Sequence, residues 1–173
     1  MIVRLRFKTK YFWIFPCLAS FVLAGCKNSL PGSDVKIQEN LDSDILITEK
    51  DEKYEAHIAR VPEGITSLSF KSPENLAGTI FEYKNGKYTV SKGLLSAEYN
   101  LDPLEKNSFI PQIESIFEAL NNKDDLKADL VEGENLIYNI DFKNLGAKIK
   151  TNKEGKILEI EIPSRDERIE FSG

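Results

Sequence analysis

The alternation of apolar and polar residues is the feature that most constrains this chain, and it runs from about Ser43 to the C-terminal end. Turn signals interrupt it at short, regular intervals. Such a period of two is typical of strands that have one face on a core and the other in water. Besides two hairpins, the pattern predicts strands at 45–49, 54–60, 66–70, 94–99, 126–131, 136–142 and 167–171.

The clearest hairpin is predicted at 78–92, where an Asn-Gly pair separates two β-rich runs. Asn-Gly favours a type I′ turn because both residues tolerate positive φ. A two-residue turn at this place pairs Tyr83 with Tyr88 and Phe81 with Val90. All four side chains then share one face, so the turn chemistry and the apolar pattern agree on the register.

A second hairpin is predicted at 147–162, around a turn rich in Asn, Lys and Gly. An even-length loop would place Ile149 opposite Leu158 and Ala147 opposite Ile160. The lysines and glutamates between them would then face water, which is the pattern of a one-sided sheet.

One segment, 108–122, has the period of a helix. Ser108 can cap it, and Pro111 falls in the first turn, where its missing N–H costs little. Its apolar residues lie on one stripe: Ile110, Ile113, Ile116, Phe117 and Leu120.

These elements predict an α+β fold, in which a curved antiparallel sheet, a half-barrel, wraps one main helix. A single helix cannot cover a flat sheet of seven or more strands, so we expect the sheet to curl. The predicted domain is single and spans 43–173.

The N-terminal segment 1–25 has the layout of a signal peptide. A basic stretch is followed by an apolar run at 11–25 and then by Cys26. The run has 15 residues, whereas a membrane-spanning helix needs about 20. An ordinary signal peptide and an uncleaved anchor remain alternatives.

The sequence Leu23-Ala24-Gly25-Cys26 resembles the lipobox of bacterial lipoproteins at each of its four positions. The resemblance implies cleavage between Gly25 and Cys26 and a lipid on the Cys26 thiol. It also implies an anchor in a bacterial membrane, on the extracytoplasmic side. The polar stretch at 26–42 is then expected to be a lipidated, flexible tether.

Charge and cysteine content exclude several classes of protein. Four of the 23 basic residues precede the apolar run and all 28 acidic residues follow it, so the formal charge beyond Cys26 is −9. That balance argues against a nucleic-acid partner. Cys17 and Cys26 are the only cysteines, so the domain has no internal disulfide and no CxxC site.

No catalytic or metal-binding constellation is apparent. His57 is the only histidine, and the alternation around it predicts that it points outward. No HExxH motif, GxSxG elbow or phosphate loop accompanies it. We therefore expect no enzyme, no metal and no cofactor; an extracytoplasmic hydrolase, with His57 as its only obvious base, is a third hypothesis.

Four aromatic residues are candidates for ligand contact: Phe81, Tyr83, Tyr88 and Phe117. They could line an apolar cavity between the sheet and the helix. The alternative, a filled core, is favoured because aromatic stripes at strand spacing usually serve packing.

The segment 73–83, followed by Asn85-Gly86, is similar to a strand-turn-strand unit of the LolA superfamily of periplasmic lipoprotein carriers and related lipid-binding lipoproteins. The resemblance implies a curved antiparallel sheet that closes over helices around a hydrophobic cavity.

The leading functional hypothesis is a membrane-anchored, non-catalytic protein of the cell envelope that binds a lipid or another apolar ligand. The alternative is an envelope module that docks a protein partner and has no ligand cavity.

Overall fold

The computed structural model describes residues 35–62, 64–84, 86–100, 109–122, 126–142 and 145–172. Within these ranges the chain forms eleven strands, one α-helix and one short 3-10 helix. Their bounds are β1 Leu41–Glu49, β2 Glu52–Val61, β3 Ile65–Ser72, β4 Thr79–Lys84, β5 Lys87–Lys92, β6 Leu95–Asn100, α2 Phe109–Asn121, β7 Leu130–Glu132, β8 Asn135–Phe142, β9 Leu145–Thr151, β10 Ile157–Ile162, η3 Pro163–Arg165 and β11 Glu167–Phe171.

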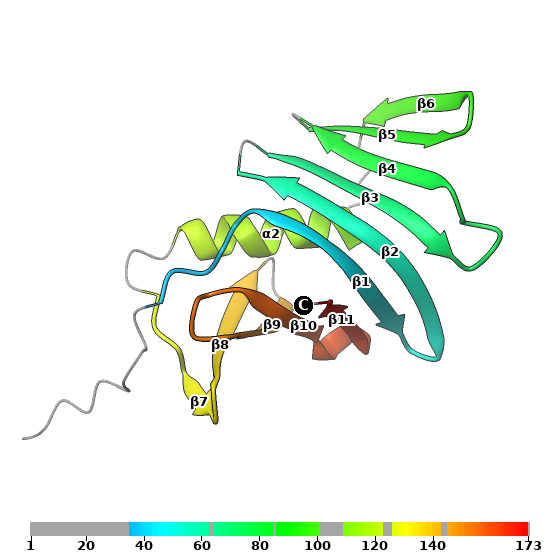
Figure 1. Ribbon diagram of the computed structural model, residues 1–173. Coiled ribbons are helices and arrows are strands. Elements are labelled where there is room, and N and C mark those ends of the chain that lie inside the picture. Colours follow the sequence, from blue (N-terminus) through cyan, green and yellow to red (C-terminus); the bar gives the residue numbers. More distant parts are fainter. Residues whose placement is uncertain are drawn as a thin grey trace, which may run out of the picture.

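The strands pair antiparallel in one sheet with the order β6-β5-β4-β3-β2-β1-β11-β10-β9-β8-β7. Every pair but one joins strands that are consecutive in the chain. The exception is β1 with β11, which unites an N-terminal meander with a C-terminal one. Helix α2 follows β6 and precedes β7, so it links the two opposite edges of the sheet (Figure 1).

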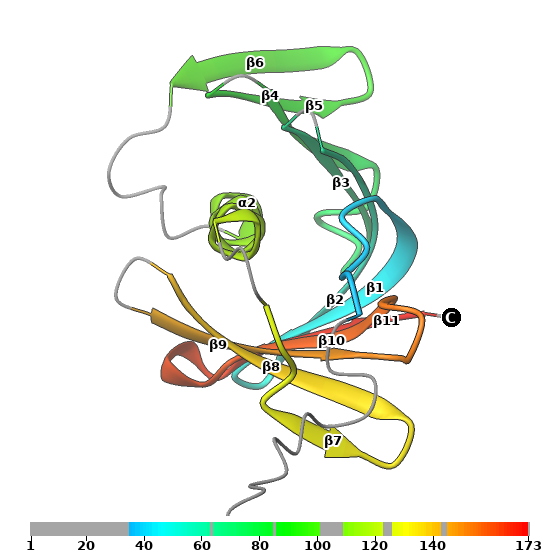
Figure 2. The ribbon, with the colours of Figure 1, turned by 90° about the vertical axis from the view of Figure 1, so that its left-hand side faces the viewer.

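The predicted helix is confirmed, and α2 lies on the concave side of the sheet, where Figure 2 shows it end-on. It packs mainly against β8 and to a lesser extent against β3. All five residues of its predicted stripe are buried, and Ile116 and Phe117 are fully enclosed. The amphipathic pattern therefore marks the face that the sheet covers.

The predicted fold class, an α+β half-barrel that wraps one main helix, is wrong. The molecule is predominantly one antiparallel sheet, and in the described part of the chain its edge strands β6 and β7 do not meet. The 13 residues of α2 span about 20 Å, whereas eleven strands span roughly 50 Å at about 4.8 Å a strand. The helix therefore covers only part of the sheet. The prediction treated the helix as the centre of the fold because its apolar stripe is so regular.

The first predicted hairpin is confirmed in register. Strands β4 and β5 pair Tyr83 with Tyr88 and Phe81 with Val90. Gly86 has a φ of 80°, the left-handed conformation that favours glycine in such a turn. Local turn chemistry was sufficient to predict this unit.

The second hairpin exists, but its predicted register is wrong. Ile149 pairs with Ile160 rather than with Leu158, because the register shifts between Ile157 and Glu159. The side chain of Asn152 accepts hydrogen bonds from the backbone N–H groups of Glu154 and Lys156, at 3.1 and 2.9 Å. This loop and the adjoining bulge bring Ile157 and Ile160 to the same buried face.

The chain is attached to the domain before the first strand begins. Residues 35–40 form no strand, but the backbone N–H of Gln38 donates to the carbonyl of Gly155 at 2.9 Å. The Tyr138 hydroxyl donates to the carbonyl of Val35 at 3.3 Å, and Ile37 is 5% exposed. Of the stretch predicted as a tether, 26–42, the part from Val35 onward therefore lies against the sheet.

Candidate functional site

The inner face of the sheet is not covered evenly. On β2, Ile58 and Arg60 are at most 4% exposed, and on β3 Leu68 is 1% exposed. Further along the same strands and on the same face, Tyr54 and Phe70 are half-buried. Helix α2 thus covers one end of this face and leaves the other end partly open to solvent.

Three half-buried aromatic side chains, Tyr54, Phe70 and Phe81, form a continuous row across β2, β3 and β4. The ring centroids of Tyr54 and Phe70 are 6.2 Å apart, and those of Phe70 and Phe81 are 5.6 Å apart. Both pairs meet edge to face, the arrangement that aromatic rings prefer. We call this set the aromatic row.

Tyr83 and Tyr88 lie beside the aromatic row, with ring centroids 5.5 Å apart. Tyr83 is half-buried, whereas Tyr88 is only 4% exposed. Three of the four predicted ligand-contacting residues, Phe81, Tyr83 and Tyr88, therefore lie on one face of the sheet; Phe81 and Tyr83 are half-buried, and Tyr88 is buried.

The fourth, Phe117, belongs to the buried face of helix α2 and is fully enclosed. The guanidinium carbon of Arg60 stands 3.9 Å from the centre of its ring, a cation–π contact. In this structure Phe117 has no surface left for a ligand.

Arg60 is itself part of a buried ionic group. Its Nε donates to Glu114 Oε1 at 3.0 Å and its Nη1 to the carbonyl of Glu39 at 2.8 Å. The Thr66 hydroxyl also bonds Glu114. This group joins β2, β3, α2 and the segment before β1, and it closes the covered end of the inner face.

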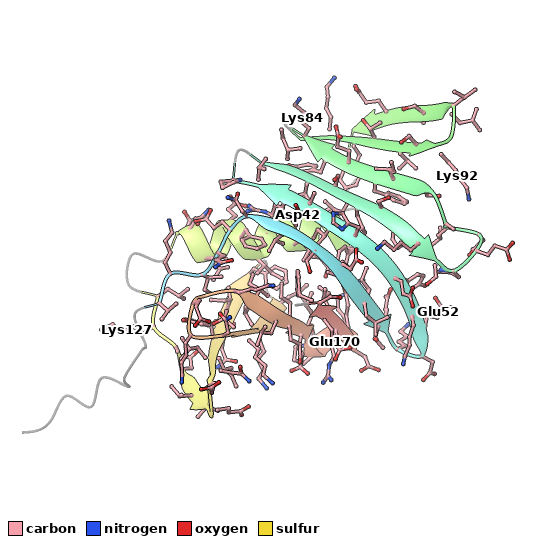
Figure 3. All side chains as sticks on the ribbon, viewed as in Figure 1. Asp42, Glu52, Lys84, Lys92, Lys127 and Glu170 are labelled. Atoms are coloured by element: carbon pink, nitrogen blue, oxygen red, sulfur yellow. The ribbon has the colours of Figure 1, made fainter. Side chains whose placement is uncertain are left out.

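The open end of the inner face is bordered by β5 and β6. Lys92 ends β5 and pairs with Thr79 on one side and Leu95 on the other, which places all three on the inner face. Figure 3 shows Lys92 at the opposite end of the β4–β5 hairpin from Lys84. Leu95 is 77% exposed and the adjacent Leu94 is fully exposed.

His57 lies on the outer face, as predicted, and contacts two carboxylates. Its Nε2 is 3.1 Å from Asp42 Oδ1 and its Nδ1 is 3.0 Å from Asp44 Oδ1. Hydrogen bonds from Lys71 first and from His57 second hold the pKa of Asp44 below its usual value. Among the residues that the structure describes, no group of three or more His, Cys, Asp or Glu side chains could hold a metal ion.

A small pocket of about 290 Å³ opens at the start of β1, away from the aromatic row. It is just below the usual size range of ligand pockets, which begins at roughly 300 Å³. Its lining residues are Gln38, Asn40, Leu41, Asp42, Ser43, Lys156, Ile157 and Phe171.

The predicted lipidation and cleavage residues, Cys26 and Gly25, lie outside the described residues. In the described part of the chain, no helix is both long and apolar enough to cross a membrane.

Sequence reasoning missed Tyr54 and Phe70 as parts of the candidate site. The sequence contains a signal for each of them, because each lies on the inward side of an alternating strand. Phe70 follows Thr66 and Leu68 on β3, and Tyr54 precedes Ala56 and Ile58 on β2. The alternation does not show how far helix α2 extends along those strands. That extent decides which inward side chains remain exposed to solvent.

Comparison with known proteins finds matches among solved structures. No protein family and no curated protein matches the sequence. Among solved structures, a LolA superfamily protein from Nitrosomonas europaea matches with a TM-score of 0.39 and 9% sequence identity, over 84% of this chain and 90% of the other.

Proposed function

We propose that this chain is a membrane-anchored, extracytoplasmic lipoprotein of the bacterial envelope, and that its domain binds a lipid or another apolar ligand without catalysis. The aromatic row carries the proposal: three rings lie together on a concave face at the place where the covering helix stops. Aromatic side chains that are half open on a concave surface are typical of apolar binding sites.

The energetics favour an occupant. Covering about 100 Å² of apolar surface on the row would contribute roughly 2.5 kcal/mol at about 25 cal/mol per Å². The ligand would gain a similar contribution from its own apolar surface. Phe81, Tyr83 and Tyr88 are the contacts predicted from the sequence, and Tyr54 and Phe70 extend the proposed site to β2 and β3.

Ligand binding is tested with the full chain in phosphatidylcholine nanodiscs and the neutral fluorophore N-phenyl-1-naphthylamine, with protein-free nanodiscs as the blank. We expect saturable binding that Phe81→Ser weakens several-fold. Ile80→Ser is the matched control, because Ile80 is the adjacent residue of β4, lies on the outer face and is 41% exposed. Absence of saturable binding, or equal loss in both variants, would contradict the proposal.

The anchor is tested by intact mass spectrometry of the chain from its native membrane fraction beside a Cys26→Ala variant. We expect a chain that begins at Cys26 and carries a lipid-sized additional mass, which the variant lacks. An unmodified chain would mean that the protein is secreted or held by its uncleaved N-terminus.

A second candidate function, docking of an envelope protein, is favoured by the β5–β6 hairpin. There Leu94 and Leu95 are strongly exposed beside β6, an edge strand of the sheet, and an exposed edge can accept a strand from a partner. A photocrosslinker placed at Leu94 would then capture one defined protein in the envelope, whereas the same crosslinker at Ile80 would not.

A further inference from the structure

Side chains of opposite charge border the two ends of the aromatic row. At its β2 end, the Tyr54 hydroxyl bonds the carboxylate of Glu52. On the β5 side, Lys92 stands on the same inner face. The apolar surface between them is therefore bordered by an anion on one side and a cation on the other.

The ammonium group of Lys92 is not neutralised within the described part of the chain. Its Nζ donates to the backbone carbonyl of Asn75 at 2.8 Å, a neutral acceptor. Lys71, Lys87 and Lys153, by contrast, each lie within 3.1 Å of a carboxylate oxygen. Lys92 is held in place and keeps its charge available to a ligand.

The inner side of strands β2 to β5 carries no other lysine. The lysines of β2, β3 and β4 lie on the outer face of the sheet. Lys53 shares that face with His57, Lys71 with Ser69, and Lys84 with Ile80. Arg60, the inward cation of β2, is already paired with Glu114. Among the described residues of these strands, the inward cation left to meet a ligand on the aromatic row is therefore Lys92.

We propose that the domain selects a long-chain fatty acid, with its carboxylate at Lys92 and its hydrocarbon chain across Phe81 and Phe70 toward Tyr54. This proposal rests on the proposed function and names the ligand class of the same site. From β5 to β2 there are three strand spacings, roughly 14 Å, which suits a single extended chain. Glu52 at the far end disfavours the opposite orientation, because it would repel the acidic head.

The test compares cis-parinaric acid with its methyl ester, which keeps the chain and removes the charge. Both are titrated into the full chain in phosphatidylcholine nanodiscs. Since Lys92 is solvent-exposed, we expect the acid to bind roughly two- to fivefold more tightly than the ester. Lys92→Gln should remove this preference and leave the affinity for the ester unchanged. Lys84→Gln, at the other end of the hairpin and on the outer face, is the matched control and should keep the preference.

The outcomes separate this inference from the proposed function. If neither the acid nor the ester binds, both fail. If both bind equally well to the unchanged chain, or if Lys92→Gln weakens both to the same extent, apolar binding stands and the fatty-acid assignment is overturned. Phosphatidylglycerol is tested as a competitor of the acid; displacement at lower concentration than oleic acid would assign the site to a phospholipid and also overturn the inference.

Discussion

Glu167 is a carboxylate placed where its charge is costly. Its side chain is 4% exposed, and burial is the first cause that raises its pKa above the usual value, while Arg165 opposes the shift. A group whose pKa is raised on folding binds its proton more readily in the folded state. The free energy of unfolding therefore falls as pH rises from the ordinary value of a glutamate toward the raised one.

We expect Glu167→Gln to increase stability at pH 7 by roughly 1 kcal/mol and to lose this advantage near pH 4. The measurement is urea unfolding of both chains at the two pH values. Glu170→Gln, on the outward side of the same strand, is the control and should show little change. A variant less stable than the unchanged chain at pH 7 would mean that the interaction with Arg165 outweighs the cost of burial.

The pair formed by buried Arg60 and half-buried Glu114 predicts a strong coupling between two residues that are far apart in sequence. Arg60→Leu leaves the largely covered Glu114 carboxylate without its cation, which should cost about 3 kcal/mol of the free energy of unfolding. Replacing both residues by leucine should cost clearly less than the sum of the single changes. A double-mutant cycle measures this coupling.

The exposed pair Lys87–Glu98, 2.7 Å apart, provides the comparison. It should couple by less than about 1 kcal/mol. Equal couplings in the two pairs would contradict the argument.

At the scale of elements, the turn between β9 and β10 holds the segment before β1. Gly155 has a φ of 81°, and a Cβ at this position would lie 2.1 Å from the carbonyl oxygen of Lys36. That contact is too short for any side chain. A glycine at this turn is therefore required by the docked segment as well as by the backbone conformation.

We expect Gly155→Ala to detach the segment and to free the backbone beside Lys36, whose side chain is already exposed, for cleavage by trypsin. Cleavage after Lys36 should become several-fold faster, with roughly 2 kcal/mol lost from stability. Gly133→Ala is the matched control, because Gly133 also has a positive φ, 64°, but no atom lies near its missing Cβ. Equal cleavage rates in the two variants would show that the loss comes from backbone conformation alone.

Elements whose signals are local could be predicted from the sequence. The β4–β5 register follows from an Asn-Gly turn between alternating residues, and α2 follows from its apolar stripe. The bulge near Ile157 was missed because it depends on hydrogen bonds that the side chain of Asn152 accepts from the backbone. For the candidate site, Phe81 and Tyr83 could be found from strand pattern, whereas the open position of Tyr54 and Phe70 depends on where the helix lies.

At the scale of the molecule, one long-range pairing holds the sheet together. Strands β1 and β11 are joined across most of the chain, and Ile47 of β1 faces Ile169 of β11 at the centre of the seam, both at most 5% exposed. Contacts between such distant segments form late and are not visible in local patterns. The sequence predicted most of the strands correctly, although the predicted strand 126–131 begins only at Leu130. It did not predict this pairing, and the predicted fold class is wrong.

We expect the stability of the sheet to decrease from this seam toward its edges. Amide hydrogen exchange followed by mass spectrometry should be slowest in peptides from β1 and β11, and much faster in peptides from β6 and β7. Ile169→Ala, which opens a cavity at the seam, should cost about 2–4 kcal/mol. Leu95→Ala, in the edge strand β6, should cost little. Protection in β6 equal to that in β1 would contradict this gradient.

The attachment of residues 35–40 to the sheet limits the length of the tether that would hold the domain at a membrane. If Cys26 carries the lipid, nine residue steps separate the anchor from Val35, a span of at most about 30 Å. That is of the order of the domain's own diameter. The ligand face would then stay within reach of a single bilayer. Such a protein would exchange its ligand with the membrane that holds it, and could not carry it across a wider gap as a diffusing shuttle does.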